Sequence, residues 1–321
     1  MKKIHLPLLC TASIALFCGH PATAAGTFPE HEINLTVNFG AGGNTDVAAR
    51  VLAKAMEKSL GKPIVIQNRP GALGTLGVTF VSRQKADGYN VGVVTYSTQA
   101  IVPHLMDVSY KMMDFQYISG FGRYRYGVVV RGDSPYKTIK DLVEASKSGK
   151  GVFFGTESVP ITLAMSELGR ASGGKFEQIS YKSGPETVIA VLSGQVDVAV
   201  PNPSDVLPYL KSGKLRLLAS ASPTRWPEEP NVQTLREVGY PVEIVSWMGL
   251  AVPKGTPADI VAKLQAASLA AVKDEDVRKN FMQLGVEPAT LTGKEYEDVL
   301  KKGYEDAGRA IKAANLPRIS G

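Results

Sequence analysis

The stretch Phe39-Gly40-Ala41-Gly42-Gly43-Asn44-Thr45-Asp46 joins an expected strand at residues 33–39 to an expected helix at residues 45–60. Glycines at such a junction let the backbone approach a ligand closely, and the free N–H groups at the start of the helix attract an anion. A dinucleotide-binding loop would need glycine in place of Thr45 and an acidic residue where the next strand ends at Gln67-Asn68. The stretch therefore predicts a strand-loop-helix unit of an α/β fold, whose loop is either a ligand site or a tight turn.

A second loop of the same kind follows the next expected strand, at residues 64–67. Its sequence is Asn68-Arg69-Pro70-Gly71-Ala72-Leu73-Gly74, and another helix is expected after it. Loops that follow parallel strands open at one edge of the sheet, where ligands of α/β folds bind, so two helix starts would point at one spot. Plain turn chemistry explains the same residues, and both interpretations stay open.

The alternation of strands and helices restarts after Gly149. It produces two more strand-to-helix junctions, Phe154-Gly155-Thr156-Glu157-Ser158-Val159-Pro160 and Tyr181-Lys182-Ser183-Gly184-Pro185. Their hydroxyls, lysine and phenol are candidates for the same cleft, although Lys182 taken singly fits a solvated surface lysine. Each half of the chain is expected to form a unit with its own core and a largely parallel sheet.

The length of 321 residues favours two domains, since single cores usually stop growing at about 250–300 residues. Residues 25–126 and 251–321 are expected to form lobe 1, and residues 127–250 lobe 2. The apolar segments 127–131 and 243–252 are expected to pair with each other between the lobes. The tail at 257–316 is expected to be helical, with Asp274-Glu275-Asp276 at a helix start rather than at a metal.

Residues 1–24 have the pattern of a secretory signal peptide. Lys2-Lys3 supplies positive charge, residues 6–18 form an apolar run, and Ala22-Thr23-Ala24 suits cleavage after Ala24. The apolar run is shorter than the ~20 residues of a membrane span, which argues against the alternative of a membrane anchor. The sequence therefore predicts an exported, periplasmic protein.

Composition narrows the function classes. The formal net charge is +6, but the basic residues are scattered, so nucleic acid is not expected as a partner. Both cysteines, Cys10 and Cys18, lie in the expected leader, and His31 and His104 are the only histidines after it. A histidine-rich metal site is therefore excluded, and no nucleophile elbow, phosphate loop or zinc-protease helix is present. No catalytic residue, metal or cofactor is expected.

Taken together, Phe39–Arg50 and Asn68–Ala72 resemble the receptors of tripartite tricarboxylate transporters, the Bordetella uptake gene (Bug/TctC-like) family. Further matches keep the family's order from about Phe28 to Leu316: Ala86-Asp87-Gly88-Tyr89, Tyr181-Lys182, Gly194-Gln195-Val196-Asp197, Gly213-Lys214-Leu215-Arg216, Trp247-Met248-Gly249-Leu250 and Pro253-Lys254-Gly255-Thr256-Pro257. The resemblance implies a type II periplasmic binding fold, with two α/β lobes joined by two crossing strands and the ligand between them.

The resemblance also implies a function and a site. A monomeric solute-binding protein would capture a dicarboxylate, tricarboxylate, amino acid or aromatic acid and deliver it to the integral-membrane subunits of a tripartite transporter. Backbone N–H groups and ordered water would hold the carboxylate. The alternative is a secreted, lyase-like α/β enzyme that acts on carboxylates. The expected ligand-binding residues are Gly40, Ala41, Gly42, Gly43, Asn44, Thr45, Asp46, Ala72, Leu73, Gly74, Thr156, Glu157, Ser158, Tyr181, Lys182, Ser183 and Gly184.

Several residues depart from the family's pattern, and Glu157 is the most informative of them. Asn38 and Gly40-Ala41 stand where prolines are frequent, Ser183 replaces a frequent glycine, and Glu157 lies in a loop that usually has small residues. In the first turn of the following helix, Glu157 would complement the helix dipole by ~0.3–1 kcal/mol. Facing the cleft, it would repel a second ligand carboxylate ~5 Å away by roughly 3 kcal/mol at an effective dielectric near 20. The second role would favour a ligand with a cationic or hydrogen-bond-donating group.

Overall fold

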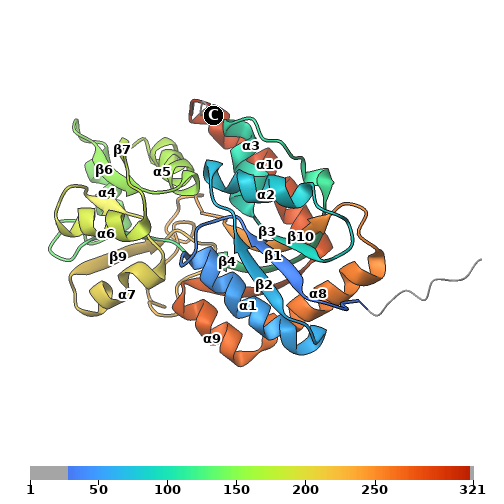
Figure 1. Cartoon of the computed structure of the whole chain (residues 1–321). Helices are drawn as coiled ribbons and strands as arrows, with labels where there is room; N and C mark the ends of the chain where they lie inside the picture. The colour runs from blue at the N-terminus through green and yellow to red at the C-terminus, as the bar shows by residue number, and fades with distance from the viewer. Residues whose placement is uncertain (1–27, 319–321) are drawn as a thin grey trace, which may run out of the picture.

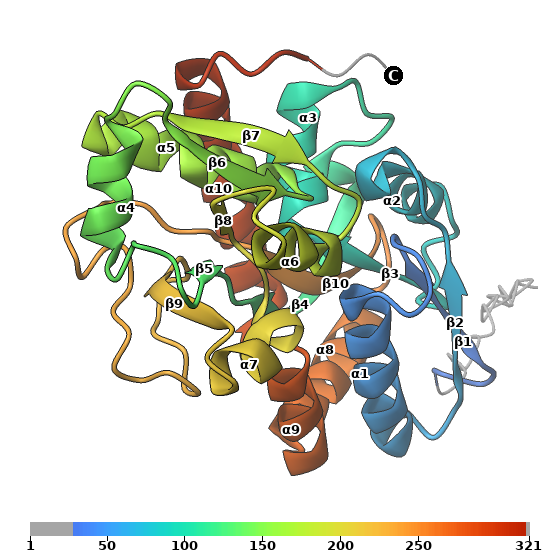
Figure 2. The same cartoon turned by 90° about the vertical axis from the view of Figure 1, so that its left-hand side faces the viewer.

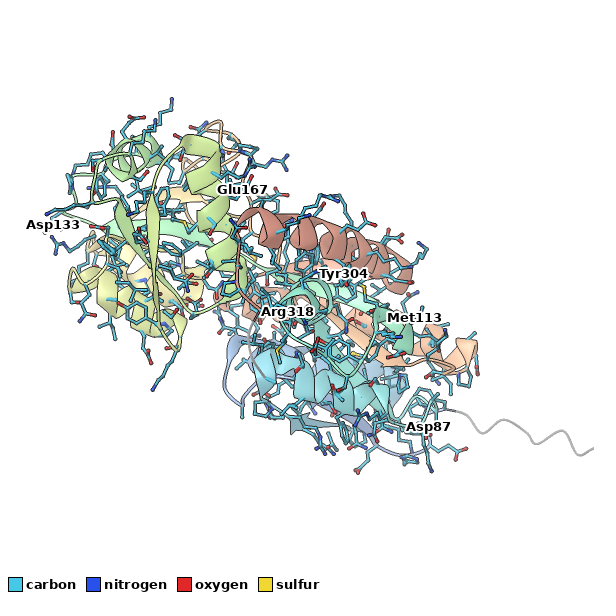
Figure 3. All side chains as sticks on the ribbon, turned by 90° about the horizontal axis from the view of Figure 1, so that it is seen from above. Asp87, Met113, Asp133, Glu167, Tyr304 and Arg318 are labelled. Atoms are coloured by element: carbon cyan, nitrogen blue, oxygen red, sulfur yellow. The ribbon has the colours of Figure 1, made fainter. Side chains whose placement is uncertain are left out.

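The computed structural model describes residues 28–318, which form two α/β lobes, each around its own sheet (Figure 1). Seen from above, the lobes lie side by side, with Asp87 toward the outer end of the first lobe and Asp133 at the outer end of the second (Figure 3). The signal peptide expected at residues 1–24 lies outside the described residues. Within the described range, no helix has both the length and the apolar character of a membrane span.

The sheet of the first lobe has six strands in the order β11-β4-β10-β3-β1-β2. In chain order they are β1 (Ile33–Val37), β2 (Ile64–Asn68), β3 (Asn90–Thr95), β4 (Phe115–Tyr124), β10 (Trp247–Pro253) and β11 (Val286–Thr292). β1 runs parallel to β2 and β3, whereas the β3–β10, β10–β4 and β4–β11 pairs are antiparallel. The expectation of a largely parallel sheet is therefore correct for only half of this lobe.

Helices cover both faces of the first sheet. On one face, α1 (Asn44–Leu60), α8 (Ala258–Lys273) and α9 (Glu275–Gln283) share a buried core with the inner residues of β1 and β3. On the other face, α2 (Thr75–Ser82) and α10 (Gly293–Ala313) close a second core. The apolar residues of α1 recur at helical spacing, which explains why its sequence predicts a helix with one buried face.

The tail after β10 is not wholly helical, contrary to expectation. β11 separates α9 from α10 and forms the edge of the sheet beside β4. The acidic run at 274–276 does begin a helix, because the Asp274 carboxylate accepts the backbone N–H groups of Asp276 at 2.9 Å and Val277 at 3.4 Å. That part of the expectation is confirmed.

The sheet of the second lobe has five strands in the order β7-β6-β8-β5-β9. They are β5 (Gly127–Arg131), β6 (Val152–Thr156), β7 (Phe176–Ser180), β8 (Val198–Ala199) and β9 (Leu215–Ser220). α4 (Ile139–Ser146) and α5 (Val159–Ser172) pack on one face. α6 (Gly184–Leu192) and α7 (Pro203–Lys211) pack on the other, as Figure 2 shows from the side of this lobe. β6 is parallel to β7 and β8, whereas β5 is antiparallel to β8 and β9.

Two short segments carry the chain between the lobes, before β5 and before β10. The expected pairing of residues 127–131 with 243–252 is wrong, because β5 pairs with β8 and β9 while β10 pairs with β3 and β4. The segments touch where the Tyr124 N–H donates to the Ser246 carbonyl at 2.9 Å. The chain thus returns to the first sheet by Trp247, a few residues ahead of the expected division at 250/251.

Arg125 ties the first crossing segment to both lobes. Its side chain is 1% exposed, and its guanidinium donates to both carboxylate oxygens of Glu228, at 2.6 and 3.0 Å. Nη2 also donates to the Met282 carbonyl of α9 at 3.3 Å. The Arg125 carbonyl accepts from the Asn202 side chain at 2.7 Å. One residue therefore holds a loop of the second lobe against a helix end of the first.

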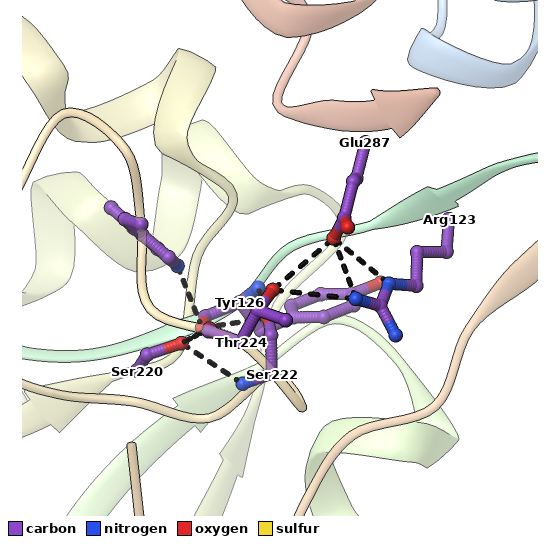
Figure 4. A network of polar contacts seen from close by, with 7 residues as sticks. Arg123, Tyr126, Ser220, Ser222, Thr224 and Glu287 are labelled. Atoms are coloured by element: carbon purple, nitrogen blue, oxygen red, sulfur yellow. Dashed lines mark hydrogen bonds and ion pairs between the residues drawn. The ribbon is translucent and has the colours of Figure 1, made fainter. Parts of the chain in front are cut away.

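A second polar contact joins the lobes beside this segment (Figure 4). Arg123 of β4 donates to Glu287 of β11 at 2.7 and 2.9 Å. Thr224 of the second lobe reaches this pair, with its hydroxyl 3.2 Å from the Glu287 carboxylate and 3.3 Å from Nη2 of Arg123. The crossing region is thus held by directional hydrogen bonds as well as by apolar packing, since Tyr124 packs against the cores of both lobes.

Candidate functional site

A cleft of about 600 Å³ lies between the two lobes, within the range of ~300–1,000 Å³ that holds small ligands. Its first wall is the loop from β1 into α1, with parts of the loops after β2 and β3. Its second wall combines the starts of α5, α6 and α7, and the crossing segments form its floor. The lining residues are Phe39, Gly40, Ala41, Gly42, Gly43, Asn44, Thr45, Leu73, Thr95, Ser97, Tyr124, Tyr126, Glu157, Ser158, Val159, Pro160, Ser183, Gly184, Pro185, Asn202, Asp205 and Ser246.

The structure brings most of the expected site residues together in this cleft. Those that line it are Gly40, Ala41, Gly42, Gly43, Asn44, Thr45, Leu73, Glu157, Ser158, Ser183 and Gly184. Those that do not are Asp46, Ala72, Gly74, Thr156, Tyr181 and Lys182. Lys182 is exposed to solvent, which agrees with its interpretation as a solvated surface lysine. Contact of any of these residues with a ligand stays a prediction.

The start of α1, which belongs to the first wall, has backbone N–H groups without a hydrogen-bond partner. Gly43 is the N-cap residue, and having no side chain it caps nothing. The first helical hydrogen bond runs from the Val47 N–H to the Gly43 carbonyl at 3.0 Å, so the amides of Asn44, Thr45 and Asp46 have no partner along the helix. Such a group of N–H donors with the helix dipole behind it is suited to an anion.

Asp46 holds the loop in place instead of lining the cleft. Its side chain is 2% exposed, and its carboxylate accepts from the Gly42 N–H at 2.9 Å, Arg50 Nε at 2.9 Å and the Asn68 amide at 2.8 Å. Burial alone would raise the pKa of Asp46, but these hydrogen bonds and the Arg50 charge lower it below its usual value. The ionised carboxylate thus fixes the glycine loop against the end of β2.

The loop after β2 contributes one side chain rather than a second helix start. A short 3₁₀ turn, Ala72–Gly74, precedes α2, and Ala72 and Leu73 have left-handed φ angles of 46° and 55°. Only Leu73 of this turn lines the cleft. A Cβ on Gly74 would lie 2.8 Å from the Asn38 side chain, so this turn packs inward against the end of β1. That this turn also offers N–H groups to a ligand stays a prediction.

Glu157 lies in the second wall and not in the first turn of α5. That helix begins at Val159 after the N-cap Ser158, and no acidic residue occupies its first turn. The interpretation of Glu157 as a first-turn complement to the dipole is therefore wrong. Its Oε2 atom is buried without a hydrogen-bond partner. Burial raises the pKa of Glu157 to about 7, opposed by a hydrogen bond from its own backbone N–H and aided by the nearby charge of Asp205.

Asp205, from the first turn of α7, is the second carboxylate of this wall. Burial raises its pKa above the usual value, although a backbone hydrogen bond at Asn202 opposes the rise. Both carboxylates approach Gly184 at the start of α6. A Cβ there would lie 2.5 Å from Asp205 Oδ2 and 3.9 Å from Glu157 Oε1. The two acids therefore border the same space.

The remaining lining residues carry no positive side chain, since neither lysine, arginine nor histidine is among them. Tyr126 is buried and Tyr124 is partly buried, and burial raises the pKa of both phenols above their usual range, so they stay neutral. Thr45 Oγ1 lies 2.6 Å from the Tyr124 hydroxyl, which links the first wall to the floor. The cleft is thus polarised, with backbone donors on one wall and carboxylates on the other.

The sequence patterns did not predict the lining residues that come from the floor of the cleft and from α7. The crossing residues Tyr124, Tyr126 and Ser246 come from segments over 100 residues apart, and no local pattern brings them together. Asp205 did have a signal, because Asn202-Pro203-Ser204-Asp205 follows the expected strand at 196–200 and forms one more strand-to-helix junction.

A family model described as tripartite tricarboxylate transporter family receptor matches residues 48–316. The chain belongs to this family. The resemblance seen in the sequence motifs is thus confirmed. The chain is also similar to Protein BugT of Bordetella pertussis, with 31% identity over 299 residues that cover 88% of each chain.

Solved structures confirm the two-lobed α/β fold of the receptor. The periplasmic binding protein BugD is 30% identical, with a TM-score of 0.76 over 90% of this chain and 99% of its own. MatC of Rhodopseudomonas palustris, solved with bound malate, is 28% identical, with a TM-score of 0.74 over 88% of this chain and 100% of its own. This receptor chain therefore spans nearly the whole length of both.

Proposed function

We propose that this receptor binds a small carboxylate in the cleft between its lobes and presents it to the integral-membrane subunits of a tripartite transporter. The observation that carries the proposal is the start of α1, whose unpaired amides open into a cleft of ligand size. The malate held by MatC supports a carboxylate as the ligand class. The leader pattern of residues 1–24 supports export to the periplasm.

The grip on the carboxylate is assigned to backbone N–H groups and not to an arginine. No arginine lines the cleft, and the Arg69 guanidinium lies 3.6 Å over the ring of Phe80. The amides of Asn44 and Thr45 are fixed in direction by the helix, so they can hold an anion without the entropy cost of ordering a long side chain. Gly40, Ala41 and Gly42 allow the ligand to approach this backbone closely.

A screen of purified protein lacking its leader tests the proposed function. Dicarboxylates, tricarboxylates, amino acids and aromatic acids are added singly in a thermal unfolding assay. Because a ligand that binds only the folded state stabilises it, a carboxylate at 100 times its Kd should add about 2.7 kcal/mol to the stability. Recovery of the bound compound unchanged after long incubation supports a receptor, whereas its conversion supports a lyase-like enzyme. No stabilisation by any carboxylate would refute the proposal.

We expect the lobes to close over the ligand by rotation about the crossing segments. The hinge should lie at residues 124–126 and 244–247, where the sheets separate and Tyr124 bonds to Ser246. Closure brings the second wall against a carboxylate already held by α1. Small-angle X-ray scattering with saturating ligand should then show a smaller radius of gyration. An unchanged radius with a ligand proven to bind would exclude closure.

A further inference from the structure

Two carboxylates from separate segments of the second lobe face one space without a positive partner. Glu157 precedes α5 and Asp205 belongs to α7, and both lie within reach of the start of α6 at Gly184. Within the described part of the chain, neither acid forms an ion pair. Lys182, the nearest cation in sequence to α6, is exposed and does not line the cleft.

Burial of two neighbouring carboxylates without a positive partner destabilises the ligand-free protein. Oε2 of Glu157 has no hydrogen-bond partner, and removing an unpaired carboxylate from water is unfavourable unless a charge or donor compensates it. Two like charges beside each other add to this cost. Backbone N–H groups of Glu157 and Asn202 offset part of this cost, but no positive side chain lines the cleft, which points to the ligand as the source of the missing charge.

The opposite wall fixes how that ligand lies. The α1 amides supply donors, and they hold a negative group at the first lobe. Glu157 and Asp205 supply acceptors at the second lobe. A molecule that spans the cleft therefore meets donors at the first lobe and acceptors at the second. Its negative group should lie at the first lobe and a positive group at the second.

We propose that the ligand of this receptor is a carboxylate that also carries a cationic group, such as an ammonium, which Glu157 and Asp205 bind together. This inference rests on the proposed function, because it takes the first-lobe carboxylate site as given. A dicarboxylate of the same length would place its second negative group against the two acids. At ~5 Å and an effective dielectric near 20, the repulsion between this second negative group and one ionised acid would lower the affinity more than tenfold.

Titration on binding distinguishes the two ligand types. Because burial raises the pKa of Glu157 to about 7, the free receptor holds part of a proton there at pH 7. The groups that face Glu157 are Asp205 of α7 and Tyr126 of the crossing segment, and neither is cationic. A cationic group lowers the pKa of Glu157, so its binding releases protons; a second carboxylate raises it, so its binding takes protons up.

The experiment compares two panels of matched carbon number by calorimetry, one of amino-substituted carboxylates and one of dicarboxylates, each from three to six carbons. Titrations at pH 7 in buffers of different ionisation enthalpy give the number of protons exchanged. The wild type should bind an amino-substituted carboxylate at least about tenfold more tightly than its matched dicarboxylate, with proton release. That preference should grow from pH 6 to pH 8 as Glu157 ionises.

Neutral isosteres supply the second readout. Glu157→Gln and Asp205→Asn should each reduce the ratio of the two affinities about tenfold or more, and Glu157→Gln should abolish most of the proton release. Glu144→Gln removes an exposed carboxylate of the same lobe that pairs with Lys147, and it should leave the ratio unchanged. Because the ratio is measured within one variant, a partly unfolded sample does not alter it.

The outcomes separate this inference from the proposed function. Tighter binding of dicarboxylates by the wild type, or a ratio that neither isostere changes, would overturn the cationic-ligand inference while leaving a carboxylate receptor intact. Failure of both panels and of the wider carboxylate screen would overturn the proposed function and the inference with it.

Discussion

Replacement of Gly42 by valine is expected to weaken carboxylate binding by about 5- to 150-fold, because a strained backbone conformation costs ~1–3 kcal/mol. Gly42 has a φ of 80°, in the left-handed region that a β-branched residue rarely adopts. Its N–H also donates to Asp46 at 2.9 Å, so a shift at this residue moves the loop that precedes the α1 amides. The measurement is the Kd of any carboxylate found in the screen, by calorimetry.

Two variants control for the effects of strain and of charge. Gly173 has a φ of 72° at the end of α5 with open space around it, so Gly173→Val imposes similar strain away from the cleft and should leave the Kd unchanged. Arg69→Gln removes an arginine that stacks on Phe80, and should change the Kd by less than about twofold, since that residue does not line the cleft. A larger loss for Arg69→Gln than for Gly42→Val would mean that an arginine grips the ligand.

Replacement of Arg125 by glutamine is expected to lower the free energy of unfolding by about 3 kcal/mol, the loss typical of breaking a buried charge pair. The guanidinium is buried, whereas Glu228 is 24% exposed, so the acid that remains is partly hydrated and the loss should fall at the low end of the usual range. The lost bonds join a loop of the second lobe to the end of α9. Urea unfolding of the ligand-free protein measures the effect.

Arg225→Gln is the matched control for this prediction. Arg225 forms a similar pair with Glu237, but both side chains are about 40% exposed, so the loss should stay below about 1 kcal/mol. Equal losses for the two variants would show that burial of Arg125 between the lobes contributes nothing particular to stability.

Local patterns in the sequence predicted the repeated strand-loop-helix units well. The β1–α1–β2 unit and the β6–α5–β7 unit follow from alternating and helical apolar periods, and their bounds agree with expectation to within a few residues. The first-wall loop and the acidic loop after β6 were found for the same reason. Each of these features is encoded within about 20 neighbouring residues, which is the range over which such patterns act.

Features that depend on distant segments were not predicted. β4 is buried along most of its length and pairs with β10 and β11, yet its own sequence, Phe-Gln-Tyr-Ile-Ser-Gly-Phe-Gly-Arg-Tyr, has no clear alternation and two glycines. The packing of α10 against β4 explains the glycine at 120, because a Cβ on Gly120 would lie 2.9 Å from the Tyr296 ring of α10. The pairing of β5 depends on the same kind of long-range contact, whereas Asp205 lies at a strand-to-helix junction that the local pattern could have indicated.

The division of the first sheet between the two ends of the chain sets an order for folding. All five strands of the second sheet come from residues 127–220, a continuous stretch. β4 instead has β10 and β11 as its neighbours, strands that follow it by more than 120 residues. Closing so long a loop carries an entropy cost that must be met before the pairing stabilises the chain. We therefore expect the second lobe to fold early and the completion of the first lobe to be the later, slower step.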